Sequence, residues 1–144
     1  MPYAVGIDML AISRLRAVLE RHNERFLRRV YTPEEVAFCR GRVHELAARF
    51  AAKEAVMKAL GTGIRGAGWR DIEILPDRRG KPLVYLYGRA RERAETIGLS
   101  ALDVSLTHER DFAIASVVGV REQADDPQES RERLVRRLRD RGLL

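Results

Sequence analysis

The sequence predicts an α+β fold in which a mainly antiparallel sheet packs against a long helix. Helical periodicity dominates the part before residue 61, and short apolar or alternating stretches bounded by turn residues dominate residues 72–120. A chain of 144 residues corresponds to one domain. We expect this domain to span residues 1–121, and we expect a polar linker and an appended basic amphipathic helix in residues 122–144.

The first predicted element is a strand at Tyr3–Leu10, which is apolar except for Asp8. This pattern is typical of a strand that is buried on both faces or that ends at a functional site. Asp8 is the first charged residue in the chain, so it is a candidate site residue. The alternative is that Asp8 caps the helix that begins near Ile12 or Ser13.

The helix expected over Ser13–Val30 carries a basic stripe. Arginines recur on one of its faces at spacings of seven, four and three residues: Arg14, Arg21, Arg25 and Arg28. A solvated helix face explains such a run of charges. The functional alternative is a docking surface for an acidic helix.

Three residues predict the start of the next helix. Thr32 can cap it, Pro33 fits its first position, and Glu35 can bond back to the cap. This short helix is expected to end near Gly41, and a long helix follows as far as Leu60.

The long helix carries the most informative charges of the chain, Glu54 and Lys58. They lie one turn apart, and Glu54 falls inside the arc of the apolar side chains. That arc consists of Val43, Leu46, Phe50, Met57 and Leu60. The opposite face is an alanine stripe that suits close packing, formed by Ala48, Ala52, Ala55 and Ala59. A carboxylate that points toward a core needs a cation, a metal ion or a proton. On a solvated face, the two charges would be an ordinary helical ion pair.

A glycine-rich turn ends this helix at Gly61, Thr62 and Gly63. Glycine there can adopt the left-handed conformation and leave backbone N–H groups open to an anion.

The second half of the chain predicts the sheet. Its expected elements are strands Ile72–Leu75 and Leu83–Leu86 around the turn Asp77–Gly80, a helix Arg89–Ile97, and strands Leu102–Thr107 and Phe112–Val120. Alternation turns Ser105 and Thr107 outward and brings Thr107 and His108 to a strand end. A lone histidine in that position is usually structural or solvated.

Composition restricts the class of partner. The net charge of +6 and the pI near 10.1 favour anionic partners, which include nucleic acid, acidic proteins and phosphorylated cofactors. The single cysteine, Cys39, excludes an intrachain disulfide and a cysteine-rich zinc site. No apolar run approaches the ~18 residues of a membrane span, and the N-terminus lacks a secretory pattern. We therefore expect a cytoplasmic protein without a membrane partner.

Several separated blocks together resemble one known family. Gly6–Asp8, Arg49–Glu54 with Lys58 and Gly61–Gly63, and Ser105–His108 match the signature of holo-acyl-carrier-protein synthases, the small bacterial class of 4′-phosphopantetheinyl transferases. Intervening segments agree in order and spacing: Thr32–Glu35, Trp69–Ile74, Gly80–Pro82 and Phe112–Ala115. The resemblance covers about the first 120 residues.

The resemblance implies an enzyme of the 4′-phosphopantetheinyl transferase fold that is a homotrimer with sites at subunit interfaces. The family transfers the 4′-phosphopantetheine arm of coenzyme A to a serine of apo acyl carrier protein and releases adenosine 3′,5′-bisphosphate, in fatty acid biosynthesis. Asp8 and Glu54 would hold the Mg²⁺ that this chemistry uses, because Mg²⁺ prefers hard oxygen ligands. Lys58 would neutralise developing phosphate charge, and His108 would contact phosphate.

The resemblance also assigns the binding residues. The residues expected to line coenzyme A are Arg49, Lys53, Lys58, Gly61, Thr62, Gly63, Ser105, Thr107 and His108. Of these, Arg49 and Lys53 suit the 3′-phosphate. The arginine stripe Arg14, Arg21, Arg25 and Arg28 would hold the acidic carrier. The base that takes the serine proton is left open between Glu54, a metal-bound water and a carboxylate near Glu35.

Two other functions compete with this interpretation. A small nucleic-acid-binding domain explains the pI and the arginines, but it has no use for Asp8 and Glu54 in apolar surroundings. Aromatic residues make up only 6% of the chain, without a stacking cluster, so we expect no nucleic-acid partner. A scaffold that binds carrier proteins without transferring a group would not need the set Asp8, Glu54 and Lys58.

Overall fold

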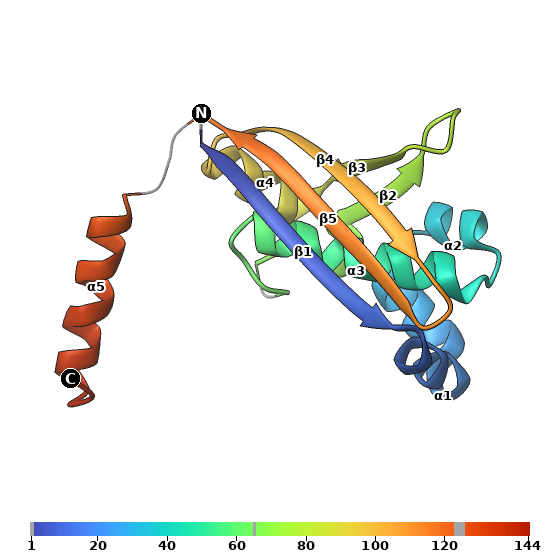
Figure 1. The fold of residues 1–144 in the computed structure, drawn as a ribbon, viewed down its shortest axis with the longest axis horizontal. Helices are drawn as coiled ribbons and strands as arrows, with labels where there is room; N and C mark the ends of the chain where they lie inside the picture. The colour runs from blue at the N-terminus through green and yellow to red at the C-terminus, as the bar shows by residue number, and fades with distance from the viewer. Residues whose placement is uncertain (1, 65, 123–125) are drawn as a thin grey trace.

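The computed structural model describes residues 2–64, 66–122 and 126–144. Its helical elements are α1 (Ile12–Val30), α2 (Pro33–Cys39), α3 (Val43–Ala59), the 3₁₀ turn η1 (Trp69–Asp71), α4 (Gly88–Thr96) and α5 (Pro127–Asp140). Its strands are β1 (Tyr3–Ala11), β2 (Ile72–Pro76), β3 (Pro82–Leu86), β4 (Leu99–His108) and β5 (Phe112–Arg121). The predicted α+β class with antiparallel sheets is confirmed, and element boundaries agree to within a few residues (Figure 1).

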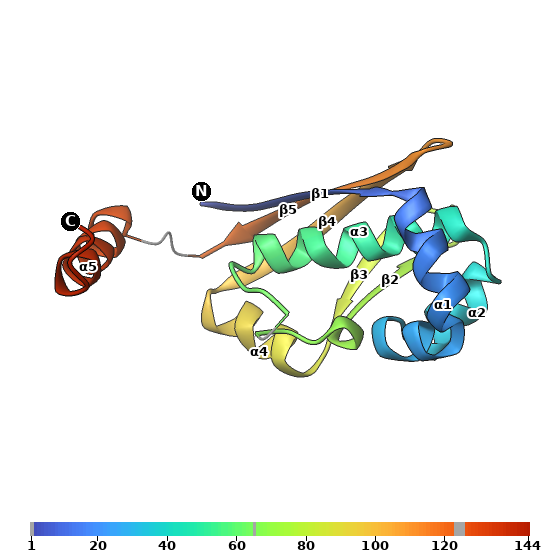
Figure 2. The same cartoon turned by 90° about the horizontal axis from the view of Figure 1, so that it is seen from below.

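The site is built on two layers, a sheet and one helix. Strands β1, β5 and β4 form an antiparallel sheet in that order, and α3 runs across one of its faces (Figure 2). The alanine stripe predicted on α3 packs there, since Ala52 and Ala55 have no exposed surface. The opposite side of α3 is also buried, with Leu46 and Leu60 at 2% and 0% exposure. The β2–β3 hairpin covers this second side together with α2.

Strand β1 is buried on one face only. Its even-numbered residues turn toward α3, whereas Tyr3, Val5, Ile7 and Met9 are each about 60% exposed, between 59% and 64%. Of the two alternatives for this strand, burial on both faces is therefore wrong for the single chain. The sequence did not show the alternation of inward and outward residues, because the outward positions are as apolar as the inward ones. These outward residues form a continuous apolar strip on the outer face of the sheet.

The first two helices lie at one end of this sheet. Helix α1 is kinked at His22, whose φ of −139° and ψ of 32° are not helical, so the predicted arginine stripe is divided into two segments. The predicted capping box of α2 is confirmed, with Glu35 N donating to Thr32 Oγ1 at 3.2 Å and Thr32 N donating to Glu35 Oε1 at 3.0 Å.

The C-terminal helix α5 lies apart from the sheet and the other helices (Figures 1 and 2). Asp126 caps it by accepting from the N–H groups of Gln128 and Glu129, so it has a defined start. The predicted linker covered residues 123–130, of which 123–125 are outside the described residues. Its last four residues are instead the first turn of α5, because Pro127 fits the first position of a helix that Asp126 caps. In the part of the chain that the structure describes, no helix has the length and apolarity needed to cross a membrane.

Candidate active site

Two carboxylates from different layers meet between β1 and α3. Asp8 lies in the middle of β1, opposite Ala115 of β5, and its side chain is only 13% exposed. Glu54 reaches it from α3, and the two side chains are hydrogen-bonded when one is protonated. The predicted pairing of these residues is thus present in the geometry of the single chain, across 46 positions of sequence.

Burial and the proximity of two carboxyl groups dominate the electrostatics of this pair. The pKa of Glu54 is raised to about 7 by burial first, and then by the hydrogen bond and the charge of Asp8, against the opposing charges of Lys58 and Arg14. A carboxyl group near Asp8 is therefore held partly protonated at neutral pH. A bound cation would oppose this shift by favouring the ionised carboxylate.

Lys58 supplies the nearest positive charge. Its Nζ donates to Asp8 Oδ1 at 3.1 Å and to the carbonyl oxygen of Ile7 at 2.9 Å, while its side chain remains 57% exposed. The sequence pairs Lys58 with Glu54, but in the structure Lys58 forms an ion pair with Asp8. An ammonium held by two acceptors and open to solvent has a third hydrogen for a ligand anion.

This donor set suits Mg²⁺. Among residues 2–64, 66–122 and 126–144, no group of three or more histidine, cysteine or carboxylate side chains could enclose a metal ion. The Asp8–Glu54 pair offers hard oxygens and leaves the other coordination positions to phosphate and water, which is the usual arrangement for Mg²⁺.

A polar pocket lies on the other side of α3 from Asp8 and Glu54. It measures about 490 Å³, and Arg49, Arg78 and His108 contribute to its walls. Arg49 is 3% exposed and is held by Ile74 O at 3.0 Å and by Glu45 Oε2 at 2.7 Å. The structure thus brings the predicted phosphate contacts Arg49 and His108 to one pocket, separate from Asp8 and Glu54 within one chain.

Lys53 does not line this pocket, and its predicted contact with coenzyme A is contradicted by the structure. Its side chain has no exposed surface, and its Nζ donates to Glu35 Oε1 at 2.6 Å, to Trp69 O at 3.0 Å and to Ile72 O at 2.6 Å. Burial lowers the pKa of Lys53, and the neighbouring Glu35 carboxylate opposes that shift. With its hydrogens all bonded inside the protein, Lys53 cannot reach a nucleotide.

In the turn after α3, backbone N–H groups that were predicted to be open to an anion already have hydrogen-bond acceptors. Gly61 has the predicted left-handed φ of +67°, but its N–H donates to Lys58 O and the N–H of Thr62 donates to Met57 O, both at 3.0 Å. These two donors therefore close the helix and are not available to an anion. The predicted contact of Gly63 with the nucleotide stays a prediction.

Ser105 and Thr107 lie on the outer face of the sheet, as alternation predicts, and both are exposed. That face carries the apolar strip of β1 and is opposite to the face covered by α3. These residues are thus separated from Glu54 by the sheet in a single chain.

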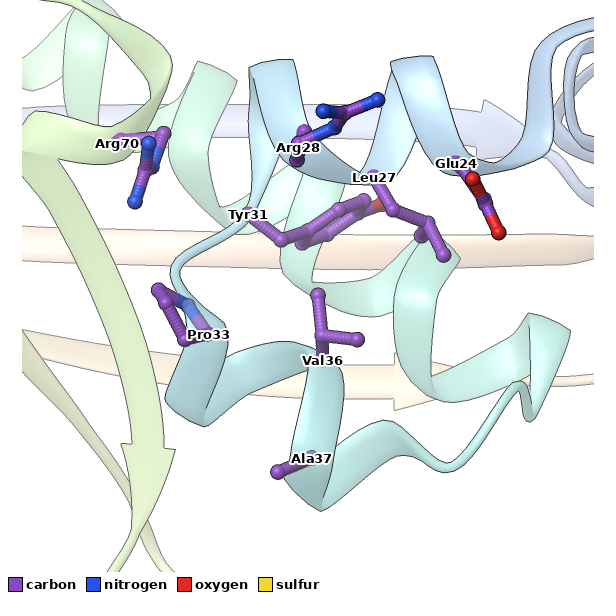
Figure 3. Close-up of a pocket in the computed structure, with 8 residues that line it drawn as sticks. All are labelled: Glu24, Leu27, Arg28, Tyr31, Pro33, Val36, Ala37 and Arg70. Atoms are coloured by element: carbon purple, nitrogen blue, oxygen red, sulfur yellow. The ribbon is translucent and has the colours of Figure 1, made fainter.

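The arginines of α1 are exposed, and one of them borders an apolar pocket. This pocket of about 460 Å³ lies between α1, α2 and η1, with Arg28 and Arg70 contributed by α1 and η1 (Figure 3). Leu27, Tyr31 and Val36 form much of its apolar lining. The sequence did not predict this pocket, because its walls come from three separate elements.

The sequence did not predict two further contributions to the site. Arg14 lies near enough to Glu54 to lower the pKa of its carboxyl group, so the first arginine of the stripe belongs to the surroundings of the site. Gly6 allows β1 to approach α3 closely, since a Cβ at Gly6 would lie 1.8 Å from the carbonyl oxygen of Ala55. A glycine inside an apolar strand was the available signal for this contact.

The fold and the site together define a class of enzyme. The chain belongs to the 4′-phosphopantetheinyl transferase superfamily, whose family model matches residues 4–117. It is 46% identical over 122 residues to the holo-[acyl-carrier-protein] synthase of Herpetosiphon aurantiacus, a match that covers 80% of this chain and 96% of the relative. The corresponding protein of Moorella thermoacetica is 50% identical over 113 residues, with 76% and 88% covered.

A solved structure shows the same similarity. Helicobacter pylori holo-[acyl-carrier-protein] synthase, crystallised in complex with coenzyme A, superposes with a TM-score of 0.75 at 33% identity, and the match covers 81% of this chain and 99% of that chain. The resemblance found in the sequence is therefore confirmed, and the chain is a transferase of this superfamily.

Proposed function

We propose that this enzyme transfers 4′-phosphopantetheine from coenzyme A to a serine of apo acyl carrier protein, with Mg²⁺, in the cytoplasmic pathway of fatty acid biosynthesis. The observation that carries the proposal is the meeting of Asp8, Glu54 and Lys58 between β1 and α3. Similarity to holo-[acyl-carrier-protein] synthases supports the choice of donor and acceptor.

The reaction is a displacement at phosphorus. The serine oxygen attacks the pantetheine-bearing phosphorus, the bond to the leaving phosphate breaks, and adenosine 3′,5′-bisphosphate departs. Asp8 and Glu54 would hold Mg²⁺, which when bound would neutralise charge on the pyrophosphate oxygens. Lys58 keeps an exposed ammonium beside Asp8 and can donate to an oxygen that gains charge.

The serine proton requires an acceptor within hydrogen-bond reach. Glu35 cannot serve, because its side chain has no exposed surface and accepts from Thr32, Lys53 and Ile74. With Glu35 excluded, we propose Glu54, a water that it orients or a metal-bound water as the acceptor.

The complete site would require more than one copy of the chain. Asp8 and Glu54 lie on one side of α3, whereas Arg49 and His108 lie at the pocket on its other side. The apolar strip on β1, in which Val5 is 63% exposed, is suited to subunit contact. A homotrimer in which one subunit contributes the carboxylates and its neighbour contributes the phosphate contacts accounts for both observations.

The carrier would dock on α1. Arg14, Arg21, Arg25 and Arg28 are exposed and positively charged, which suits an acidic partner. The apolar pocket beside Arg28 provides a place to bury an aliphatic side chain of that partner (Figure 3).

Intact mass spectrometry tests the proposal directly. Apo acyl carrier protein incubated with the enzyme, coenzyme A and Mg²⁺ should gain about 340 Da, and excess EDTA should prevent the gain. Asp8→Asn, which retains the size of the side chain, should also prevent it. A folded enzyme that modifies none of several apo carriers would refute the proposed function.

A further inference from the structure

The Lys53 side chain is the centre of a buried arrangement that the proposed reaction does not use. We call it the Lys53 cage, which consists of Lys53 Nζ and its acceptors Glu35 Oε1, Trp69 O and Ile72 O at 2.6, 3.0 and 2.6 Å. An ammonium has three hydrogens, and each has an acceptor in the cage. One side chain thereby connects α3 to α2, η1 and β2.

Glu35 is held as firmly as Lys53. Its Oε1 also accepts from Thr32 N at 3.0 Å, and its Oε2 accepts from Ile74 N at 3.0 Å. Both partners of the ion pair have fully buried side chains. Capping α2 explains the bond with Thr32, but it does not explain a buried lysine on the next helix.

The cage fixes the position of the residue that follows it. Neighbouring residues on an α-helix point about 100° apart, so a fixed Lys53 determines the direction of Glu54. On the other side of Glu54, Ala55 rests against the backbone of Gly6 in β1. Glu54 is therefore held between an ionic anchor at Lys53 and a backbone contact at Ala55.

Such an anchor is needed because the two carboxylates of the site repel each other. Asp8 and Glu54 repel each other when both are ionised, and Lys58 and Arg14 offset part of that repulsion, so their close approach requires a fixed position of α3. A buried ion pair is in general weak evidence for stability, since well-packed apolar residues often replace one without loss. In this protein, the ion pair can also fix the orientation of α3.

We infer that the Glu35–Lys53 ion pair is a positioning pair, which holds α3 in the rotation that keeps Glu54 against Asp8 for metal binding. This inference rests on the proposed function, in which Asp8 and Glu54 hold Mg²⁺. It predicts that the pair affects metal affinity more than it affects folding.

The test uses the double variant Glu35→Gln/Lys53→Met, which removes both buried charges at once. Mn²⁺ binding is measured by electron paramagnetic resonance on the full chain with saturating coenzyme A, and unfolding is measured by urea titration. We expect the double variant to fold and to bind Mn²⁺ about tenfold more weakly. The single variant Glu35→Gln, which retains the oxygen that accepts from Lys53, should weaken binding about threefold and provides the test if the double variant does not fold.

The control is a variant that loses stability elsewhere. Ile97→Ala removes a partly buried side chain that follows α4 and should leave Mn²⁺ affinity within twofold of the parent. Parent-like Mn²⁺ binding in the folded double or Glu35→Gln variant would overturn the positioning role while leaving the proposed function intact. An equal loss in Ile97→Ala would also overturn it, since general destabilisation would then explain the effect. Absence of Mn²⁺ binding by the parent would refute the metal assignment and this inference with it.

Discussion

The backbone of Gly6 in β1 touches the backbone of Ala55 in α3. A Cβ at Gly6 would lie 1.8 Å from Ala55 O and 3.1 Å from Ala59 N, and both are main-chain atoms that cannot rotate away. This contact sets the spacing between the sheet and the helix, and Asp8 and Glu54 meet across that spacing.

Gly6→Ala should therefore separate the two layers. We expect a loss of more than about 3 kcal/mol in the free energy of unfolding, because the helix must move by an ångström or more. Urea denaturation followed by circular dichroism measures the change. Gly63→Ala is the matched control for stability, since a Cβ there meets nothing within 4 Å. Equal stability of the two variants would show that the contact is not rigid.

Glu54→Gln should exchange activity for stability. The pKa of Glu54 is raised to about 7 in the folded protein, so the unfolded chain ionises this group at a lower pH than the folded protein does. The free energy of unfolding therefore falls as the pH rises from the ordinary pKa of glutamate to 7, and the loss is complete above pH 7. Removing the charge should raise the free energy of unfolding at pH 8, in EDTA, by roughly 0.5–1 kcal/mol after allowance for solvent screening. Transfer activity should be abolished. The control Glu92→Gln, at an exposed site, should change neither the stability nor the transfer activity. A lower melting temperature for Glu54→Gln than for the parent would contradict this prediction.

Charge reversal on α1 should affect the carrier and not coenzyme A. Arg21→Glu/Arg25→Glu places two like charges against an acidic partner, so the KM for the carrier should rise about 10- to 100-fold while the KM for coenzyme A changes less than threefold. These two residues are chosen because Arg14 also acts on Glu54. Steady-state kinetics with each substrate varied in turn give both constants. Arg16→Glu, an exposed arginine outside the stripe, is the control, and equal losses for both substrates would count against docking on α1.

Val5→Glu should convert the proposed trimer into monomers. A carboxylate in the middle of the apolar strip would be buried without a partner in a subunit interface. Light scattering coupled to size exclusion should show a threefold smaller mass, and activity should be lost although Asp8 and Glu54 are unchanged. Tyr85→Glu, at a 42% exposed site on β3, should remain a trimer. An active monomer would refute a site shared between subunits.

The buried thiol of Cys39 should be unreactive in the folded protein. Burial is the main cause that raises its pKa to about 11, and the side chain has no exposed surface. At pH 8 only about one thiol in a thousand would be ionised. Iodoacetamide followed by mass spectrometry should give no adduct within an hour in buffer and complete reaction in guanidinium chloride. Rapid alkylation in buffer would show that α2 opens readily.

The sequence predicted the elements because their signals are local. The capping box at Thr32 and Glu35, the periodicity of α3 and the alternation around Ser105 each depend on a few adjacent residues, and each was recovered. The pairing of Asp8 with Glu54 came from resemblance, and its geometry is present in the fold.

The errors concern contacts between distant segments. The resemblance placed Lys53 near a ligand, but the sequence could not reveal that Glu35 and two carbonyl oxygens would surround it. Composition could not separate the outward from the inward residues of β1, because both sets are apolar except for Asp8. The kink at His22 also could not be predicted, because no proline or glycine lies near it in the sequence.

Lys53, Glu54 and Ala55 are consecutive, yet each serves a different neighbour: the buried cage, the carboxylate site and the backbone of β1. Inserting or deleting one residue earlier in α3 would turn all of them by about 100° and remove all three contacts in a single step. Changes of length in the turn after the helix would disturb none of them, and surface loops accept such changes at little thermodynamic expense. We therefore expect length variation among natural relatives to avoid α3 and to accumulate after Gly63.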